Sequence, residues 1–83
     1  DEMQGNLHGA IADYTQAISL NPRIDVAYTH RADARRDHGD LHGAIADYQR
    51  YLALGGGVRH GDQTRVEALI STLKQKLEGR TSS

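Results

Sequence analysis

Apolar side chains recur at spacings of three and four residues along four stretches of this chain. This period places them on one side of an α-helix. The stretches cover residues 6–20, 24–37, 41–54 and a last segment that starts at residue 62 or 64 and continues to residue 77. We therefore predict an all-α protein of four helices in antiparallel order, with the last helix docking on the third.

Local signals mark the ends of the first two helices. The residue before a proline avoids helical backbone angles, so Asn21-Pro22 ends the first helix. Asp25 is expected as the N-cap or as an acid in the first turn of the second helix. Gly39 supplies the left-handed residue that ends the second helix, and Asp40 caps the third.

The glycines at positions 55–57 are predicted to stop the third helix and to lead into a linker that contains His60. Thr64 and Glu67 have the spacing of a capping box, in which the hydroxyl and the carboxylate each accept a hydrogen bond from a free backbone N–H group. This pair is therefore predicted to start the fourth helix.

One segment of the chain occurs twice. Residues 5–14 read GNLHGAIADY, and residues 39–48 read GDLHGAIADY, so the period is 34 residues and only Asn6 and Asp40 differ. A fixed period of this size is typical of one supersecondary unit used more than once. The repeated acids Asp13 and Asp47 are expected to accept a hydrogen bond or ion pair from a neighbouring repeat, with Arg31 as a candidate donor to either one.

These features together resemble the tetratricopeptide repeat family, whose period is also 34 residues. The resemblance covers residues 5–54 and rests on these positions: Ala17, Ile18, Leu20, Asn21, Pro22, Tyr28, Ala32, Gly39, Asp40, Leu41, Ala44, Ile45 and Tyr48. Three positions depart from the family's pattern: Arg31 in place of the common Leu, Tyr51 in place of a small residue, and Gly55-Gly56 where Asp-Pro would close the repeat.

The resemblance implies a fragment of an α–α superhelix, or solenoid, made of antiparallel helix–turn–helix repeats. Residues 1–83 then form one domain, in which residues 5–24 are the second half of a repeat, residues 25–56 are one complete repeat, and residues 62–79 are a C-terminal capping helix. Since such arrays generally need about three repeats, we expect the chain to belong to a longer repeat protein or to associate with itself.

The composition of the chain excludes several classes of protein. The chain has 83 residues, ten basic and eleven acidic side chains, a formal net charge of −1 and no Cys. A disulfide framework and a thiolate metal site are therefore impossible, and no charge bias favours nucleic acid or an anionic membrane. No apolar run approaches the roughly 20 residues of a membrane span, and the compartment stays undetermined, with the cytoplasm as the default.

Two groups of side chains could suggest metal binding or acid–base catalysis. His38 and His42 are four residues apart, but the Gly39 turn lies between them, so we interpret them as solvated and expect no metal site. Asp33 and Asp37 alternate with arginines, which is typical of a helix surface with ion pairs rather than of acid–base catalysis. We expect neither an enzyme nor a cofactor.

The leading hypothesis is a module that binds a peptide or helix of a protein partner. The resemblance implies that the first helices of successive repeats line a groove, which here contains Val26, Thr29, Asp33, Arg36 and Asp37. Acidic chaperone tails are disfavoured as ligands, because Thr29 and Asp33 stand where members that bind such tails carry Asn and Lys.

The alternative hypothesis is a structural or oligomerisation segment. The first helix carries large apolar residues that lack the helix that would precede them in a repeat array: Leu7, Ile11, Tyr14 and Ile18. Two copies that place this patch together would form a symmetric homodimer. Both hypotheses concern protein partners, and neither identifies one.

Overall fold

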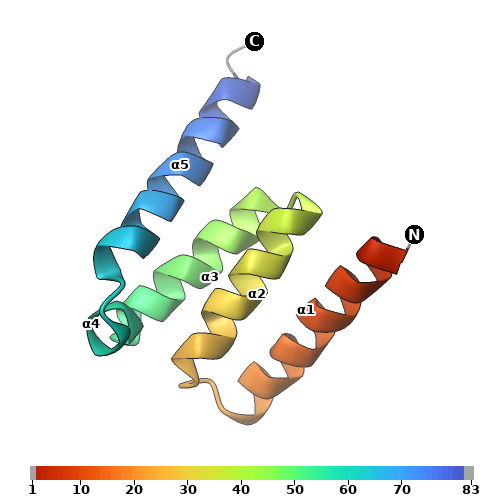
Figure 1. Ribbon diagram of the computed structural model, residues 1–83, viewed down its shortest axis with the longest axis vertical. Coiled ribbons are helices and arrows are strands. Elements are labelled where there is room, and N and C mark those ends of the chain that lie inside the picture. The colour runs from red at the N-terminus through yellow and green to blue at the C-terminus, as the bar shows by residue number, and fades with distance from the viewer. Residues whose placement is uncertain (1, 82–83) are drawn as a thin grey trace.

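The computed structural model describes residues 2–81, with side chains described for residues 7–79, and this part of the chain contains helices and turns without any strand. The helices are α1 (Glu2–Leu20), α2 (Asp25–His38), α3 (Leu41–Ala53), α4 (Gly56–His60) and α5 (Gln63–Thr81) (Figure 1). The prediction of an all-α fold is therefore confirmed.

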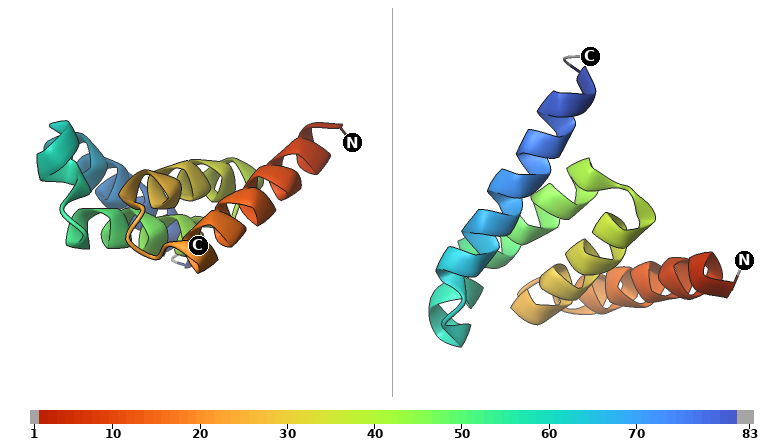
Figure 2. Two further views of the ribbon diagram at one scale, coloured as in Figure 1. Left: turned by 90° about the horizontal axis from the view of Figure 1, so that it is seen from below. Right: turned by 45° about the horizontal axis from the view of Figure 1, so that its top comes forward.

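The four long helices lie side by side in chain order, and each runs opposite to the one before it (Figure 1). Helix α2 packs between α1 and α3, and α3 packs between α2 and α5. The helices do not share one plane, since α1 crosses the others obliquely (Figure 2). Among the described residues, α1 packs against one other long helix, whereas α2 and α3 each pack against two.

The turn between α2 and α3 forms as predicted. Gly39 has a φ of 96°, which L side chains rarely adopt, and its N–H group bonds the Arg36 carbonyl at 3.0 Å. The Asp40 side chain accepts a hydrogen bond from the Gly43 N–H at 3.0 Å, so it caps α3. The chain needs only these two residues to reverse direction, which holds α2 and α3 close together.

The glycine run ends α3 as predicted, but it does not form a linker, and that part of the prediction was wrong. It starts an extra helix, α4, bounded by the positive-φ residues Gly55 and Gly61. Gly56 and Gly57 are buried, and a Cβ atom on Gly57 would lie 2.8 Å from the Cα of Gln63. Glycine therefore serves close packing here, because α4 folds back against the start of α5.

His60 lies at the end of α4 and not in a loop. Its ring stacks on the Tyr51 ring with centroids 6.2 Å apart, and its Nε2 atom is 3.4 Å from Asp25 Oδ2. Arg59 pairs with the same buried carboxylate, which belongs to the first turn of α2. The ion pair of Arg59 with Asp25 thus connects α4 to α2 across 34 residues of sequence.

The predicted capping box at Thr64 is also wrong. Helix α5 begins at Gln63, so Thr64 lies within the first turn. The Asp62 carbonyl accepts the first helical bond, from the Val66 N–H at 3.0 Å, and the Glu67 carboxylate accepts a hydrogen bond from Gln63 Nε2 at 2.9 Å. Asp62, which was the other predicted start of this helix, therefore precedes α5, two residues before Thr64.

One core joins α2, α3 and α5. Its fully buried members include Ala32 of α2, and Ala44 and Tyr48 of α3. Helix α5 docks on α3 as predicted, through Val66, Ile70 and Leu73, with Leu69 partly buried at the edge. Tyr51 is 2% exposed, so the large residue in place of a small one fills the space between α3 and the α4–α5 segment.

The α2–α3 interface contains a buried carboxylate held by two arginines. Asp47 is 3% exposed and receives two hydrogen bonds from Arg31, at 2.9 Å from Nε and 2.8 Å from Nη2. Arg35 Nη1 donates a third, at 3.1 Å. Arg31 also donates to Thr15 Oγ1 of α1 at 3.1 Å, so one guanidinium group links three helices. The expected pairing of Arg31 with Asp47 is confirmed.

This network predicts unequal effects of the same substitution at the two repeated acids. Asp47→Ala should lower the free energy of unfolding by about 3–5 kcal/mol, because it leaves Arg31 buried without its partner. Asp13→Ala should change it by less than about 0.5 kcal/mol, since Asp13 is exposed. Urea unfolding followed by circular dichroism measures both values. Equal losses for the two variants would show that the buried pair does not hold α2 to α3.

Candidate functional site

The five residues predicted to bind a partner lie along one stripe of α2. Val26 is 42% exposed, and the Asp33 and Asp37 side chains are 51% and 57% exposed. Thr29 and Arg36 complete the stripe at helical spacings of three and four residues, and both are partly buried. The structure therefore brings the predicted residues together on an accessible surface of α2.

The Tyr48 hydroxyl of α3 lies directly beneath this stripe. It donates a hydrogen bond to Asp33 Oδ1 and accepts one from Arg36 Nη1 at 3.2 Å. Arg36 also lies 3.8 Å from Asp33 Oδ1 and 3.5 Å from Asp37 Oδ1. Because a buried ring anchors these groups, the charges of the stripe are held in place and do not move freely in solvent.

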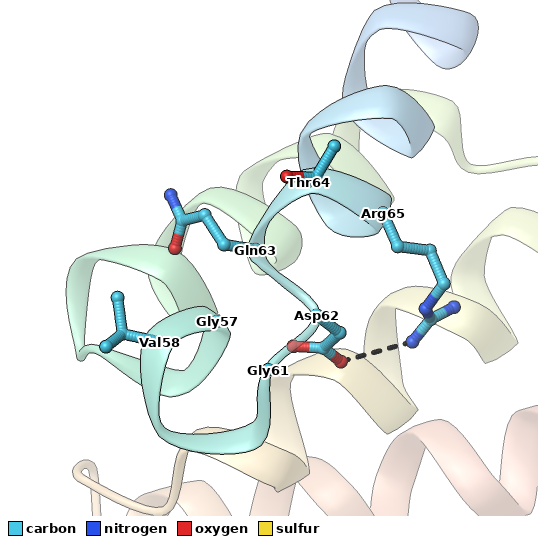
Figure 3. Close-up of a pocket in the computed structure, with 7 residues that line it drawn as sticks. All are labelled: Gly57, Val58, Gly61, Asp62, Gln63, Thr64 and Arg65. Atoms are coloured by element: carbon cyan, nitrogen blue, oxygen red, sulfur yellow. Dashed lines mark hydrogen bonds and ion pairs between the residues drawn. The ribbon is translucent and has the colours of Figure 1, made fainter.

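A second set of polar groups lies where α3 meets the start of α5. Tyr51 donates its hydroxyl proton to Asp62 Oδ1 at 2.7 Å, and Arg65 Nη2 donates to Asp62 Oδ2 at 3.2 Å. Figure 3 shows the Asp62 and Arg65 side chains turned toward each other. Asp62 therefore accepts hydrogen bonds from both α3 and α5.

These contacts fix the protonation states. Burial, together with the hydrogen bond to Asp33, raises the pKa of Tyr48 well above its ordinary value. Burial and the bond to Asp62 raise the pKa of Tyr51 to about 12. The Tyr51 hydroxyl in turn lowers the pKa of Asp62. Both phenols are thus neutral hydrogen-bond donors near neutral pH.

An open hollow of 440 Å³ lies between α4 and the first turn of α5 (Figure 3). Its lining consists of Gly57, Val58, Gly61, Asp62, Gln63, Thr64 and Arg65. The two charged groups of this lining pair with each other, and Gln63 pairs with Glu67. The hollow therefore presents neither a free charge nor a nucleophile–base pair that could carry out chemistry.

Three contributors to this region were not assigned to it from the sequence. Tyr48 was interpreted as a packing residue, which its ring is, but its hydroxyl reaches the surface of α2. Asp62 and Arg65 were placed only near the start of a helix. The one available signal was the spacing of three between Tyr48 and Tyr51, which places the two residues on one side of α3.

The residues of the alternative hypothesis lie along one side of α1, at helical spacings of four, three and four residues. Ile18 packs against the core, and the Tyr14 ring stacks on His30 of α2 with centroids 5.4 Å apart. Leu7 and Ile11 are partly exposed. All four residues are partly buried, and contacts with the rest of the protein already cover part of this stripe.

Histidines meet in a pairing that the sequence did not suggest. His8 and His38 contact edge to face, with ring centroids 4.5 Å apart, across the α1–α2 interface. Within the described residues no group of three or more potential ligands is placed to hold a metal ion. In the same part of the chain no helix is long and apolar enough to cross a membrane.

Comparison with known proteins gives no relative. No protein-family model matches the chain, and neither a curated protein nor a solved structure matches it. The assignment to tetratricopeptide repeats therefore continues to rest on the resemblance of the residues themselves.

The raised tyrosine pKa values predict a loss of stability in alkali. The folded state keeps the Tyr51 proton up to about pH 12, whereas the unfolded chain releases it near pH 10. The free energy of unfolding should therefore be fully present below about pH 10 and fall as the pH rises toward 12. Urea unfolding across this range should show a smaller fall for Tyr51→Phe. A wild-type stability that stays constant over this range would contradict the buried, hydrogen-bonded hydroxyls.

Proposed function

We propose that this chain is a protein-interaction module that binds a peptide or helix of a partner on the exposed stripe of α2. The stripe consists of Val26, Thr29, Asp33, Arg36 and Asp37. Its function is recognition, since the described residues around it supply hydrogen-bonding and apolar groups but no paired nucleophile and base.

The observation that carries the proposal is the anchoring of the stripe from below. The buried Tyr48 ring fixes Asp33 and Arg36 through its hydroxyl, while Val26 stays 42% exposed. On the opposite side of the helix, Arg31 and Arg35 hold α2 to α3 through Asp47. A surface ordered before the partner arrives costs less conformational entropy on binding, so pre-organisation favours affinity.

The charges of the stripe indicate the chemistry of the partner. Two carboxylates, Asp33 and Asp37, surround one guanidinium group, Arg36, which leaves one net negative charge. A segment with a basic side chain opposite the carboxylates and an apolar side chain opposite Val26 complements this pattern. An acidic tail would meet like charge on the stripe.

The repeat resemblance supports the same surface independently. In the tetratricopeptide family the helix at the position of α2 contributes to a ligand groove, and the 34-residue period of this chain matches that family. The chain would then contribute to a solenoid with α5 as its capping helix. The amphipathic docking of α5 on α3 is compatible with such a cap.

Selection from a phage-displayed library of random peptides tests this proposal. Enriched peptides should carry Lys or Arg next to an apolar residue, and fluorescence polarisation should then measure their affinity for variants. Val26→Asp should weaken binding by about tenfold or more, since a charge replaces an apolar contact. Val58→Asp is the matched control, because Val58 is 79% exposed and lies on α4; it should leave the affinity within about twofold.

Two results would refute the α2 surface. The first is a selection that yields no binder to the folded chain. The second is a set of binders that lose no affinity with Val26→Asp. Circular dichroism of both valine variants checks that the helices stay folded, so a loss of binding reports on the surface itself.

A further inference from the structure

Two imidazole rings meet where α1 packs on the end of α2. His8 of α1 and His38, the last residue of α2, are both exposed, and their rings contact each other with centroids 4.5 Å apart and planes at 89°. His42 is closer to His38 in the sequence, but among the described side chains it makes no ring contact. The structure therefore brings together two nitrogen ligands from separate helices.

The separation of the two rings suits one shared metal ion. With metal–nitrogen bonds of about 2.0–2.1 Å, two imidazoles in adjacent positions around one ion have ring centres roughly 4.5–5 Å apart. The observed 4.5 Å lies in this range. Rotation of the rings about their side-chain bonds is enough to direct one nitrogen of each toward the ion, and the exposure of both side chains leaves room for this rotation. The helix backbones do not have to move.

Other contacts hold the two helices in this position. Arg31 of α2 donates a hydrogen bond to Thr15 Oγ1 of α1 at 3.1 Å, and the Tyr14 ring stacks on His30. The two histidines are therefore placed by the packing of α1 on α2. A ligand pair that is held in place by its scaffold loses little conformational entropy when an ion binds.

The charges around His38 do not oppose a cation. Arg35 and Arg36 lie in the same last turn of α2, but Arg35 pairs with Asp47 at 3.1 Å and Arg36 with Asp37 at 3.5 Å. The C-terminal end of a helix also carries partial negative charge, which favours a bound cation.

The repeated sequence shows that the position of His8 stays accessible in a packed helix. His42 has the same place in the second copy of the ten-residue segment. Helix α3 packs against both α2 and α5, and His42 is nevertheless exposed. Solvent access at this position is therefore compatible with a neighbouring helix on each side.

We propose that His8 and His38 together bind one divalent transition-metal ion of the zinc and copper class, and that this ion joins α1 to α2. Imidazole is the commonest protein ligand for such ions. The described residues contain no group of three or more potential ligands, so water molecules complete the coordination. The site does not use the stripe of α2 and is independent of the proposed function.

Isothermal titration calorimetry with zinc chloride at neutral pH tests the site. The folded chain should bind one ion, and His8→Ala and His38→Ala should each weaken binding by about tenfold or more, because each removes one of two ligands. His42→Ala is the matched control, since it removes an exposed histidine from the same local sequence; it should leave the affinity within about twofold. Circular dichroism without zinc checks that all three variants keep their helices.

NMR locates the ion and measures its effect on α1. Zinc should shift the ring signals of His8 and His38 together and leave those of His42 in place. With free zinc at about ten times its dissociation constant, amides that exchange through opening of α1 should exchange about tenfold more slowly, because the opened state lacks the site. The His8→Ala variant should show no such slowing.

Three outcomes would overturn the proposal. The first is zinc binding by the wild-type chain that is no tighter than binding by His8→Ala. The second is binding that is lost with His42→Ala and kept with His8→Ala, which would place the ion across the turn after α2. The third is a zinc-dependent dimer in sedimentation equilibrium, which would assign the ion to a contact between two copies.

Discussion

The arrangement of this chain depends on the pairing of Asp47 with Arg31 and Arg35. Asp47 is 3% exposed, and three N–H groups of the two arginines satisfy its oxygens and compensate for the loss of water. Burial of Asp47 in turn requires α2 and α3 to meet in one register, which places Ala32 against the Ala44 side of the core. Arg31 also donates to Thr15, so the same residue fixes the position of α1. The pKa of Arg31 is raised by its bond to Asp47, which keeps the cation charged.

This pairing separates the two sides of α2. The side that faces α3 and α1 is used for folding, and its polar groups are bound to those helices. Hydrogen bonds to the Tyr48 hydroxyl of α3 hold two residues of the remaining stripe, Asp33 and Arg36. A helix anchored in this way holds its outward residues in fixed positions. Binding a partner then costs these residues little conformational entropy, which favours recognition. The proposed binding surface is therefore a consequence of how the helix is held, and the positions of Val26 and Asp37 follow from the helical period.

Local chemistry in the sequence predicted much of this structure. The left-handed Gly39, the Asp40 cap and the docking stripe of α5 depend on short-range patterns, and the structure contains them. Contacts between residues far apart in the sequence were harder to predict. Glycines at 55–57 read as a break, because nothing nearby shows that Gln63 and Tyr51 will pack against them. His60 acquires its place from Asp25, 35 residues away along the chain. The role of the Tyr48 hydroxyl depends on an acid of another helix, so helical spacing alone could only assign its ring to the core.

In this protein the neighbours of a helix, and not its own sequence, determine how firmly the helix is held. Native-state amide hydrogen exchange tests this most directly, because α1 and α3 offer matched pairs of residues in identical local sequence. The amides of Ile45 and Tyr48 should exchange only through global unfolding, and those of Ile11 and Tyr14 should exchange at least about tenfold faster, through opening of α1 alone. Equal protection of the two helices would contradict the account, since it would mean that α1 is held as firmly as α3 without a second neighbour.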